Sequence, residues 1–348
     1  MMAGRALLDR FRAPALTPVG LIAVVTVVFG VASISGSVAT TNAAVLLLIH
    51  VVLVVGLYSF VGPSGIMSFG HTGFMAVGAY TAALLAMPAG PKQTRLPGLP
   101  QVISGSQFTL TTALLCAALA ALLVAAVSGA VMMRLNGLAA GIATLALMVV
   151  VHVVVGQWTA VTAGPGSLVG VPVWTTAAVA WLTAVLAILV VYAFQQSSTG
   201  LKLRASREDE LAARASGVRI YRLRLVAFVL SAVIVGAGGA LFALRVSVLS
   251  PDAVYLDVTF LTIAMLVVGG MRSLTGAVFG VVVLSVVAEV VRRLEAGFQL
   301  GSLVIPELPG LRQIAVALIL LCVLLLRPNG LTSGRELHQL VGGKSRNS

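Results

Sequence analysis

Ten long apolar runs, almost free of charged side chains, follow one another along this 348-residue chain. They cover approximately residues 18–36, 43–60, 66–87, 109–133, 138–156, 173–194, 225–244, 258–270, 275–291 and 313–326. A helix of about 20 residues crosses the hydrocarbon core of a bilayer, and only helices or closed barrels satisfy their backbone hydrogen bonds there. Charged residues make up 9% of the chain, against roughly 25% in soluble domains. We therefore predict an all-α polytopic membrane protein with about ten transmembrane helices, within a range of about 8 to 12.

The runs define a single transmembrane domain, residues 18–327, between a basic N-terminal segment, 1–17, and a polar C-terminal tail, 328–348. The first run could be the core of a cleaved signal peptide, but its length favours a membrane anchor. The run at 258–270 has only 13 residues, fewer than a straight span needs, so we expect it to be broken or re-entrant. We expect residues 333–348, which are polar, to be frayed.

The positive charges gather on one side of the predicted spans. If the N-terminus is cytoplasmic, sixteen of the 22 Lys and Arg residues fall on the cytoplasmic side, including those of the 195–224 loop and of the tail. The other six are Lys92, Arg95, Arg245, Arg292, Arg293 and Arg312. This bias follows the positive-inside rule. It predicts cytoplasmic N- and C-termini and external loops at 88–106 and 157–172, and it accounts for the net charge of +12 without a nucleic-acid partner.

Glycines interrupt two of the apolar runs. Gly70, Gly73 and Gly78 surround His71 just after the sequence GPSG at 62–65, and a second cluster occupies 267–280. Such glycines allow the backbone to unwind at membrane depth against protein or a water-filled cavity. Paired interruptions predict an internal repeat with a central substrate path, whose candidate residues are Ser68, Gly70, His71, Thr72, Gly73, Gly269 and Gly270. Close helix packing is the alternative, because two glycine pairs fit the GxxxG pattern: Gly276 with Gly280, and Gly137 with Gly141.

The sequence gives no sign of a catalytic, cofactor or metal site. The sequence GKS at 343–345 resembles the end of a phosphate-binding P-loop, but His338 stands where that motif requires glycine. The histidines lie in separate segments without metal-binding spacing: His50, His71, His152 and His338. We therefore do not expect an enzyme. An ion-coupled transporter or channel using His71 or Glu289 and a membrane scaffold remain alternatives to a permease, although Glu289 can also form a local ion pair with Arg292 and Arg293.

The loop at 195–224 carries the most specific signal in the chain. Its segment 200–224 holds seven basic and three acidic residues. The sequence EDELAA at 208–213 favours a helix, which Gly217 can end. We predict one short helix over 207–216, with acidic residues at its start and Arg214 in its last turn, as the helix dipole favours. Such a helix between two spans suits docking by a cytoplasmic partner; a basic loop resting on anionic lipid is the alternative.

At this loop the sequence resembles a known family. Glu210, Ala212, Ala213 and Gly217 fit the Glu-x-Ala-Ala-x-x-x-Gly coupling signature of ABC importer permeases. More closely, REDELAA (207–213), SGV (216–218) and LVAFVLSA (225–232) look like the branched-chain amino acid permeases of the LivM and LivH type, and the LivM type most of all. Four further segments match in order: GHTGF (70–74), RLNGLAAGIATLA (134–146), TAGPGSLVGVP (162–172) and GGMRSLTG (269–276). The resemblance covers about residues 43–330.

This resemblance implies a permease subunit of an ATP-binding cassette importer in the bacterial plasma (inner) membrane. The expected cargo is a branched-chain or related amino acid, with urea or a short amide as the alternative. The implied partners are a second permease subunit, identical or different, two cytoplasmic ATPase subunits and an extracytoplasmic substrate-binding protein. The resemblance also implies which residues couple transport to the ATPase: Arg207, Glu208, Asp209, Glu210, Ala212, Ala213 and Gly217.

Overall fold

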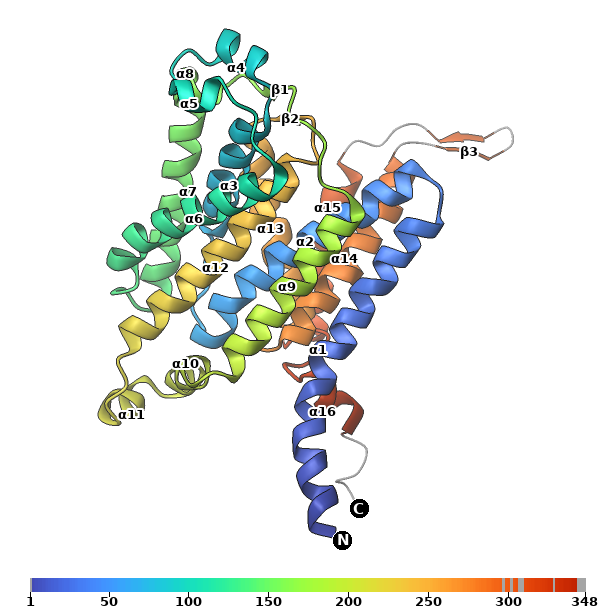
Figure 1. The fold of residues 1–348 in the computed structure, drawn as a ribbon. Coiled ribbons are helices and arrows are strands. Elements are labelled where there is room, and N and C mark those ends of the chain that lie inside the picture. Colours follow the sequence, from blue (N-terminus) through green and yellow to red (C-terminus); the bar gives the residue numbers. More distant parts are fainter. Residues whose placement is uncertain (1, 296–297, 301–302, 306–309, 328, 343–348) are drawn as a thin grey trace.

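The computed structural model describes residues 2–295, 298–300, 303–305, 310–327 and 329–342, which form a bundle of long helices (Figure 1). Among these residues, eight helical segments are long and apolar enough to cross a membrane: α1 (Met2–Ile34), α2 (Val38–Ser64), α6 (Leu110–Met132), α7 (Gly137–Gln157), α9 (Ala177–Gln196), α12 (Ile220–Ala243), the 3₁₀ turn η1 (Asp252–Val254) together with α13 (Leu256–Gly269), and α14 (Leu274–Glu295). The pair α3 (His71–Ala86) and α4 (Ala89–Arg95), bent by 114°, is a further broken span or a re-entrant segment. The prediction of an all-α polytopic membrane protein is confirmed.

Short elements join the spans at the two ends of the bundle. One end carries α4, α5 (Gln101–Ser104), α8 (Thr159–Thr162) and the antiparallel pair β1 (Leu168–Val169) and β2 (Val248–Leu249) (Figure 1). The other end carries α10 (Ser198–Glu208), α11 (Glu210–Ala215), α16 (Leu337–Gly342) and the start of α1. We call these the α4–α8 end and the α10–α11 end. The strands β3 (Phe298–Leu300) and β4 (Leu303–Ile305) form a hairpin between α14 and the shorter apolar helix α15 (Leu311–Leu326).

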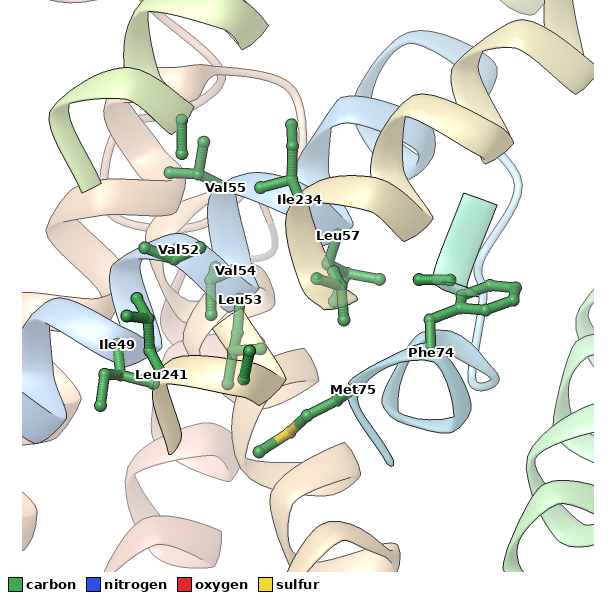
Figure 2. Close-up of a cluster of buried hydrophobic side chains, with 14 of the residues drawn as sticks. Ile49, Val52, Leu53, Val54, Val55, Leu57, Phe74, Met75, Ile234 and Leu241 are labelled. Carbon is green, nitrogen blue, oxygen red and sulfur yellow. The ribbon is translucent and has the colours of Figure 1, made fainter. Parts of the chain in front are cut away.

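The core lies where α12 packs against both α2 and α3 (Figure 2). In the apolar window of α2, 89% of the residues are buried, against 22% for α6, so α2 is a central helix and α6 a peripheral one. Glycines let α3 and α12 approach closely, because a methyl group at Gly78 or Gly239 would overlap the backbone of the opposite helix. Small residues at such crossings are the usual means by which membrane helices gain packing contacts.

Two expectations about irregular backbone need correction. The run at 258–270 is not a broken span by itself, because η1 lengthens it to the 18-residue segment Asp252–Gly269; the sharp bend lies between α3 and α4 instead. The unwinding expected around Gly70, Gly73 and Gly78 is confined to residues 65–70, since Gly73 and Gly78 lie inside the regular turns of α3. Helical backbone satisfies its own hydrogen bonds in the apolar interior, so the chain unwinds no further than it must.

The tail is docked over residues 329–342, which corrects the expectation of a frayed segment from 333 onward. The Glu336 carboxylate accepts hydrogen bonds from the Leu274 and Thr275 amides, at 2.9 and 3.2 Å, and so caps the start of α14. The Thr332 hydroxyl donates to the Gly269 carbonyl oxygen at the end of α13 (3.0 Å). The last carbonyl groups of α13 and the first amides of α14 have no partner within their own helices, so the tail satisfies donors and acceptors that the helices cannot. The GKS sequence at 343–345 lies outside the described residues.

A buried lysine organises the loop at 88–106. The Lys92 ammonium group is enclosed and donates to the carbonyl oxygens of Ser106 (2.7 Å) and Ile103 (3.0 Å). A charged group removed from water needs such partners. The loop is therefore a folded structure on the α4–α8 end.

Candidate functional site

The unwound residues 65–70 run through the bundle between α2 and α3. Gly65 ends α2 in the left-handed region, at φ +70°, where a side chain is disfavoured by about 1 kcal/mol. The Phe69 amide donates to the Thr144 hydroxyl of α7 (3.2 Å), and a methyl group at Gly70 would overlap the Thr144 carbonyl oxygen. The segment is therefore held tightly against α7, and Gly70 serves this close approach.

His71 begins α3 inside an aromatic enclosure. Its ring lies 5.6–5.8 Å, centroid to centroid, from the rings of Phe60, Phe74 and Phe228. Its Nδ1 shares a hydrogen bond of 2.5 Å with the Ser68 hydroxyl, whereas Nε2 is buried without a partner among the described residues. The structure thus brings together Ser68, Gly70 and His71. The aromatic rings keep the imidazole away from other charged groups, unlike the linked ionisable chain of a proton relay.

Two threonines and a methionine join three helices beside His71. The Thr72 and Thr259 hydroxyls lie 2.5 Å apart, and each is 3.1 Å from the Met148 sulfur. Thr72 comes from α3, Thr259 from α13 and Met148 from α7. All three are buried. Sequence reasoning named Thr72 but missed Thr259 and Met148, because nothing in the sequence indicates that α7 and α13 meet at this point.

Hollows lie on both sides of this Thr72–Thr259–Met148 cluster. Toward the α4–α8 end is a cleft too narrow for water, lined by Gly73, Ala76, Met148, His152, Val155, Pro251 and Val254. Toward the α10–α11 end is a cavity of about 350 Å³, lined by Val61, Gly65, Met67, Arg207, Val267, Met271, Arg272 and Asn329. Residues 65–73 run from the cavity, past the cluster, to the cleft. Residues 65–73 thus connect two separate hollows, and we refer to this segment with its two hollows as the route.

The second glycine cluster lies at the α13–α14 turn, apart from His71. A methyl group at Gly269 would overlap the Gly276 carbonyl oxygen, and one at Gly280 would overlap that of Met265. Gly270, at φ +120°, is packed against the tail. These glycines therefore allow close helix packing, the alternative to a substrate path. Their neighbours Val267 and Met271 nevertheless line the cavity. Of the other GxxxG pair, Gly141 packs near the Met67 carbonyl oxygen, whereas a methyl group at Gly137 would meet open space.

The charged loop forms two helices rather than the single helix predicted over 207–216. Asp209 has extended backbone (φ −147°, ψ 105°) and separates α10 from α11. Its carboxylate accepts a hydrogen bond from the Ala212 amide (2.9 Å), as an N-cap residue does. The side-chain cap competes with helix continuation, so Arg207 and Glu208 end α10 and Glu210 begins α11.

Gly217 ends α11 as predicted. Its φ is +77°, and the amides of Gly217 and Val218 donate back to the carbonyl oxygens of Arg214 (2.9 Å) and Ala213 (3.1 Å). This pattern closes a helix whose next residue is left-handed. Ala213 faces the bundle and Ala212 faces outward beside Leu211, whose side chain is 81% exposed. Sequence reasoning missed Leu211, a large apolar side chain offered outward on a polar helix.

Arg207 and Glu208 join α10 to two parts of the bundle. The Arg207 guanidinium group donates to the Gly62 carbonyl oxygen near the end of α2 (2.6 Å) and to Glu208 (2.7 Å). The Glu208 carboxylate also pairs with Arg272 of the α13–α14 turn (3.3 Å). The hydrogen bond from Arg207, with the charges of Arg207 and Arg272, lowers the pKa of Glu208. Arg272, which sequence reasoning missed as a partner, links this loop to the second glycine cluster.

Glu210 joins α11 to the membrane helices. Its carboxylate accepts from Arg214 (2.6 Å) within α11 and from Arg224 (3.0 Å) in α12, and Arg224 also donates to Asn136 between α6 and α7. Burial acts to raise the pKa of Glu210, but the hydrogen bonds from Arg214 and Arg224 outweigh it, so that the pKa is lowered. Arg224 is only 6% exposed. The signature residue Glu210 therefore anchors α11 through two residues, Arg224 and Asn136, that sequence reasoning did not select.

Glu289 forms the local ion pair expected from its spacing. Its carboxylate accepts from Arg292 (2.8 Å) and Arg293 (3.0 Å) at the end of α14. Such an arrangement neutralises a carboxylate within one helix. Nothing in this geometry favours an ion-coupled site.

Comparisons with known proteins show which family the chain resembles over most of its length. A family model described as the permease component of branched-chain amino acid transport systems matches residues 39–326. The chain is 30% identical over 287 residues to the high-affinity branched-chain amino acid transport system permease protein LivM of Escherichia coli (strain K12). It is 28% identical over 288 residues to the protein of the same name in Salmonella typhimurium. Each alignment covers 73% of this chain and 64% of the relative, so the chain matches less than two thirds of these relatives' length. No solved structure matches the chain.

Proposed function

Because the chain belongs to the family of permease components of branched-chain amino acid transport systems, we propose that it is the permease subunit of an ATP-binding cassette importer. Its cargo is a branched-chain or related amino acid, the class named for its LivM relatives. The chain itself makes and breaks no covalent bond, and ATP is hydrolysed on a separate subunit. No observation favours urea or amides as cargo.

The observation that carries this proposal is the interrupted route along residues 65–73. The route reaches the cavity at Gly65 and the cleft at Gly73. Between them the Thr72–Thr259–Met148 cluster closes it. A transporter that alternates its access needs a closed barrier between two approaches. We assign Ser68, Gly70, His71, Thr72 and Gly73 to this route, with Gly269 and Gly270 as the packed turn that supports its cavity end.

The coupling residues lie where they can transmit motion from an ATPase. Arg207 and Glu208 contact α2 and the α13–α14 turn, and Glu210 contacts α12. Leu211 and Ala212 face outward from α11, as the apolar contact residues of a small docking interface would. When nucleotide binding draws two ATPase subunits together, α10 and α11 move with them. Those contacts then shift α2, α12 and α13 around the route.

The remaining assignments follow from charge and from the family. The α10–α11 end is cytoplasmic, because sixteen of the 22 basic residues belong to that side, which also makes both termini cytoplasmic. The α4–α8 end faces outward and receives a substrate-binding protein. A second permease subunit, identical or different, completes the route in the bacterial plasma membrane.

Reconstitution tests the proposal. The chain is copurified from its native membrane, the ATPase and binding protein are identified, and the complex is placed in liposomes. We expect uptake of labelled leucine, isoleucine or valine that requires ATP and the binding protein. The chain alone should not accumulate these amino acids under an ion gradient. Accumulation by the chain alone would instead establish an ion-coupled transporter.

A further inference from the structure

The cavity at the α10–α11 end combines apolar walls with one incompletely paired charge cluster. Val61, Met67, Val267 and Met271 supply aliphatic and thioether groups. Arg207 and Arg272 line it, and the Glu208 carboxylate, next to its lining residues, pairs with both guanidinium groups. The volume of about 350 Å³ falls in the range of about 300–1,000 Å³ found for small-molecule sites.

The hydrogen bonds of this charge cluster leave some N–H groups of Arg272 and one carboxylate oxygen of Glu208 without a partner among the described residues. Arg207 is engaged through Nε, Nη1 and Nη2, by Gly62 and Glu208. Arg272 donates only through Nη2, to Glu208 Oε1, and Oε2 of Glu208 accepts nothing among the described residues. An unused guanidinium edge binds a carboxylate in bidentate fashion, and a free carboxylate oxygen accepts from an ammonium group. A zwitterion with an aliphatic side chain supplies all three complements.

We infer that this cavity binds a free aliphatic amino acid from the cytoplasm, with its carboxylate on Arg272 and its ammonium group on Glu208. This inference rests on the proposed function, because it makes the delivered cargo a ligand of its own transporter. The same two residues form the 3.3 Å ion pair between α10 and the α13–α14 turn. The charged groups of a bound amino acid use the free edge of Arg272 and Oε2 of Glu208, so they draw on the same two charges and weaken this pair. Accumulated cargo therefore loosens the connection between the coupling loop and the route and slows further import.

An anionic lipid headgroup is the other ligand that an arginine at this end could attract. The cavity walls argue for the amino acid, because Val61 is buried near the end of the central helix α2 rather than facing lipid. A lipid also offers no aliphatic group directly beside its anionic headgroup that would fill these walls.

The test uses the complete complex in liposomes loaded with ATP, with or without internal leucine, and measures the initial uptake of external labelled leucine. Internal leucine should slow uptake. Leucinol, which lacks the carboxylate, and 4-methylpentanoic acid, which lacks the ammonium group, should not. Losing a charged hydrogen-bond partner costs about 1.5–3 kcal/mol, so Arg272→Gln should raise the half-inhibitory internal leucine concentration about tenfold or more. Lys202→Gln, which removes an exposed charge from α10 away from the cavity, should leave the inhibition unchanged.

If Arg272→Gln abolishes uptake, the rate measurement is replaced by equilibrium binding of labelled leucine to the purified complex without its binding protein. The dissociation constant should then rise by the same factor, about tenfold or more. Inhibition by leucine that is unaltered in Arg272→Gln, or equal inhibition by 4-methylpentanoic acid, would overturn the inference. The inference would also be overturned if native mass spectra showed an anionic lipid that binds only when Arg272 is present and that leucine does not displace. Normal uptake that ignores internal leucine defeats only this inference, whereas absence of leucine uptake by the unmodified complex defeats the proposed function.

Discussion

Replacing Glu210 by Gln should loosen α11 from the bundle while the rest of the fold stays intact. Glu210 is the only carboxylate that the described residues place on Arg224, and Arg224 is 6% exposed. Breaking a fully buried pair costs about 3–5 kcal/mol, and an exposed pair contributes about 0.2–1 kcal/mol. Because the Glu210 side chain is 32% exposed and glutamine keeps one acceptor oxygen, we expect a cost of about 1–2 kcal/mol.

Hydrogen–deuterium exchange of the peptide containing residues 210–218 measures this cost. The amides of Ala213 and Ser216 are bonded within α11 and exchange only when the helix opens. A cost of about 1–2 kcal/mol should speed their exchange by about 5- to 30-fold. Arg214→Gln is the matched control, because it removes the other guanidinium group that pairs with Glu210. The Arg214 side chain is 57% exposed, so this variant should change the exchange rate by no more than about twofold. Equal acceleration in both variants, or none in Glu210→Gln, would refute the anchoring role of the Arg224 pair.

Acid should reproduce this loosening reversibly. The pKa of Glu210 is lowered in the folded protein, so its ion pairs are fully present above the usual carboxylate pKa of about 4.3 and are lost as pH falls through the lower folded value. A spin label on the exposed position of Leu211→Cys should therefore keep constant mobility from pH 8 to about 5 and gain mobility below about 4. The Glu210→Gln background should be mobile throughout. A mobility transition centred above pH 5 would contradict the assignment.

Three further outcomes are expected. Gly217→Val should cost about 1 kcal/mol through its φ of +77° and reduce ATPase copurification and substrate-stimulated hydrolysis, whereas Gly217→Asn should retain both; equal losses would place the effect elsewhere. Gly70→Ala should lower the yield of monodisperse protein because its methyl group would overlap α7 backbone, whereas Gly73→Ala, with 3.3 Å to the nearest atom, should fold but slow uptake; well-folded and fully active Gly70→Ala protein would argue against the close approach. A cysteine at the exposed position Ala205 should resist an impermeant maleimide in intact cells, whereas Gln101→Cys should react; labelling of Ala205→Cys from outside would reverse the proposed sidedness.

The sequence by itself determined the features that depend on local pattern. Long apolar runs require helices in a bilayer, so the membrane fold and the succession of spans followed from composition and spacing. The Gly217 helix end and the Glu289 ion pair were also predictable, because each depends on residues within four positions of one another. The family resemblance rested on such short segments, read in order. The internal repeat stays a prediction.

Only the tertiary structure decided which helices meet. An apolar run reads the same whether it faces lipid or protein, since the bilayer is as apolar as the packed interior, so the central place of α2 was hidden from the sequence. For the same reason Thr259 and Met148, distant in the chain from Thr72, could not be linked to it, nor Arg224 and Asn136 to Glu210. The docking of residues 329–342 likewise depends on Glu336 and Thr332, whose side chains bond backbone groups of other helices. The break at Asp209 is instead a local cap on the Ala212 amide. The proposed route, the Thr72–Thr259–Met148 cluster that closes it and its connection to α10 and α11 are all made of such long-range contacts.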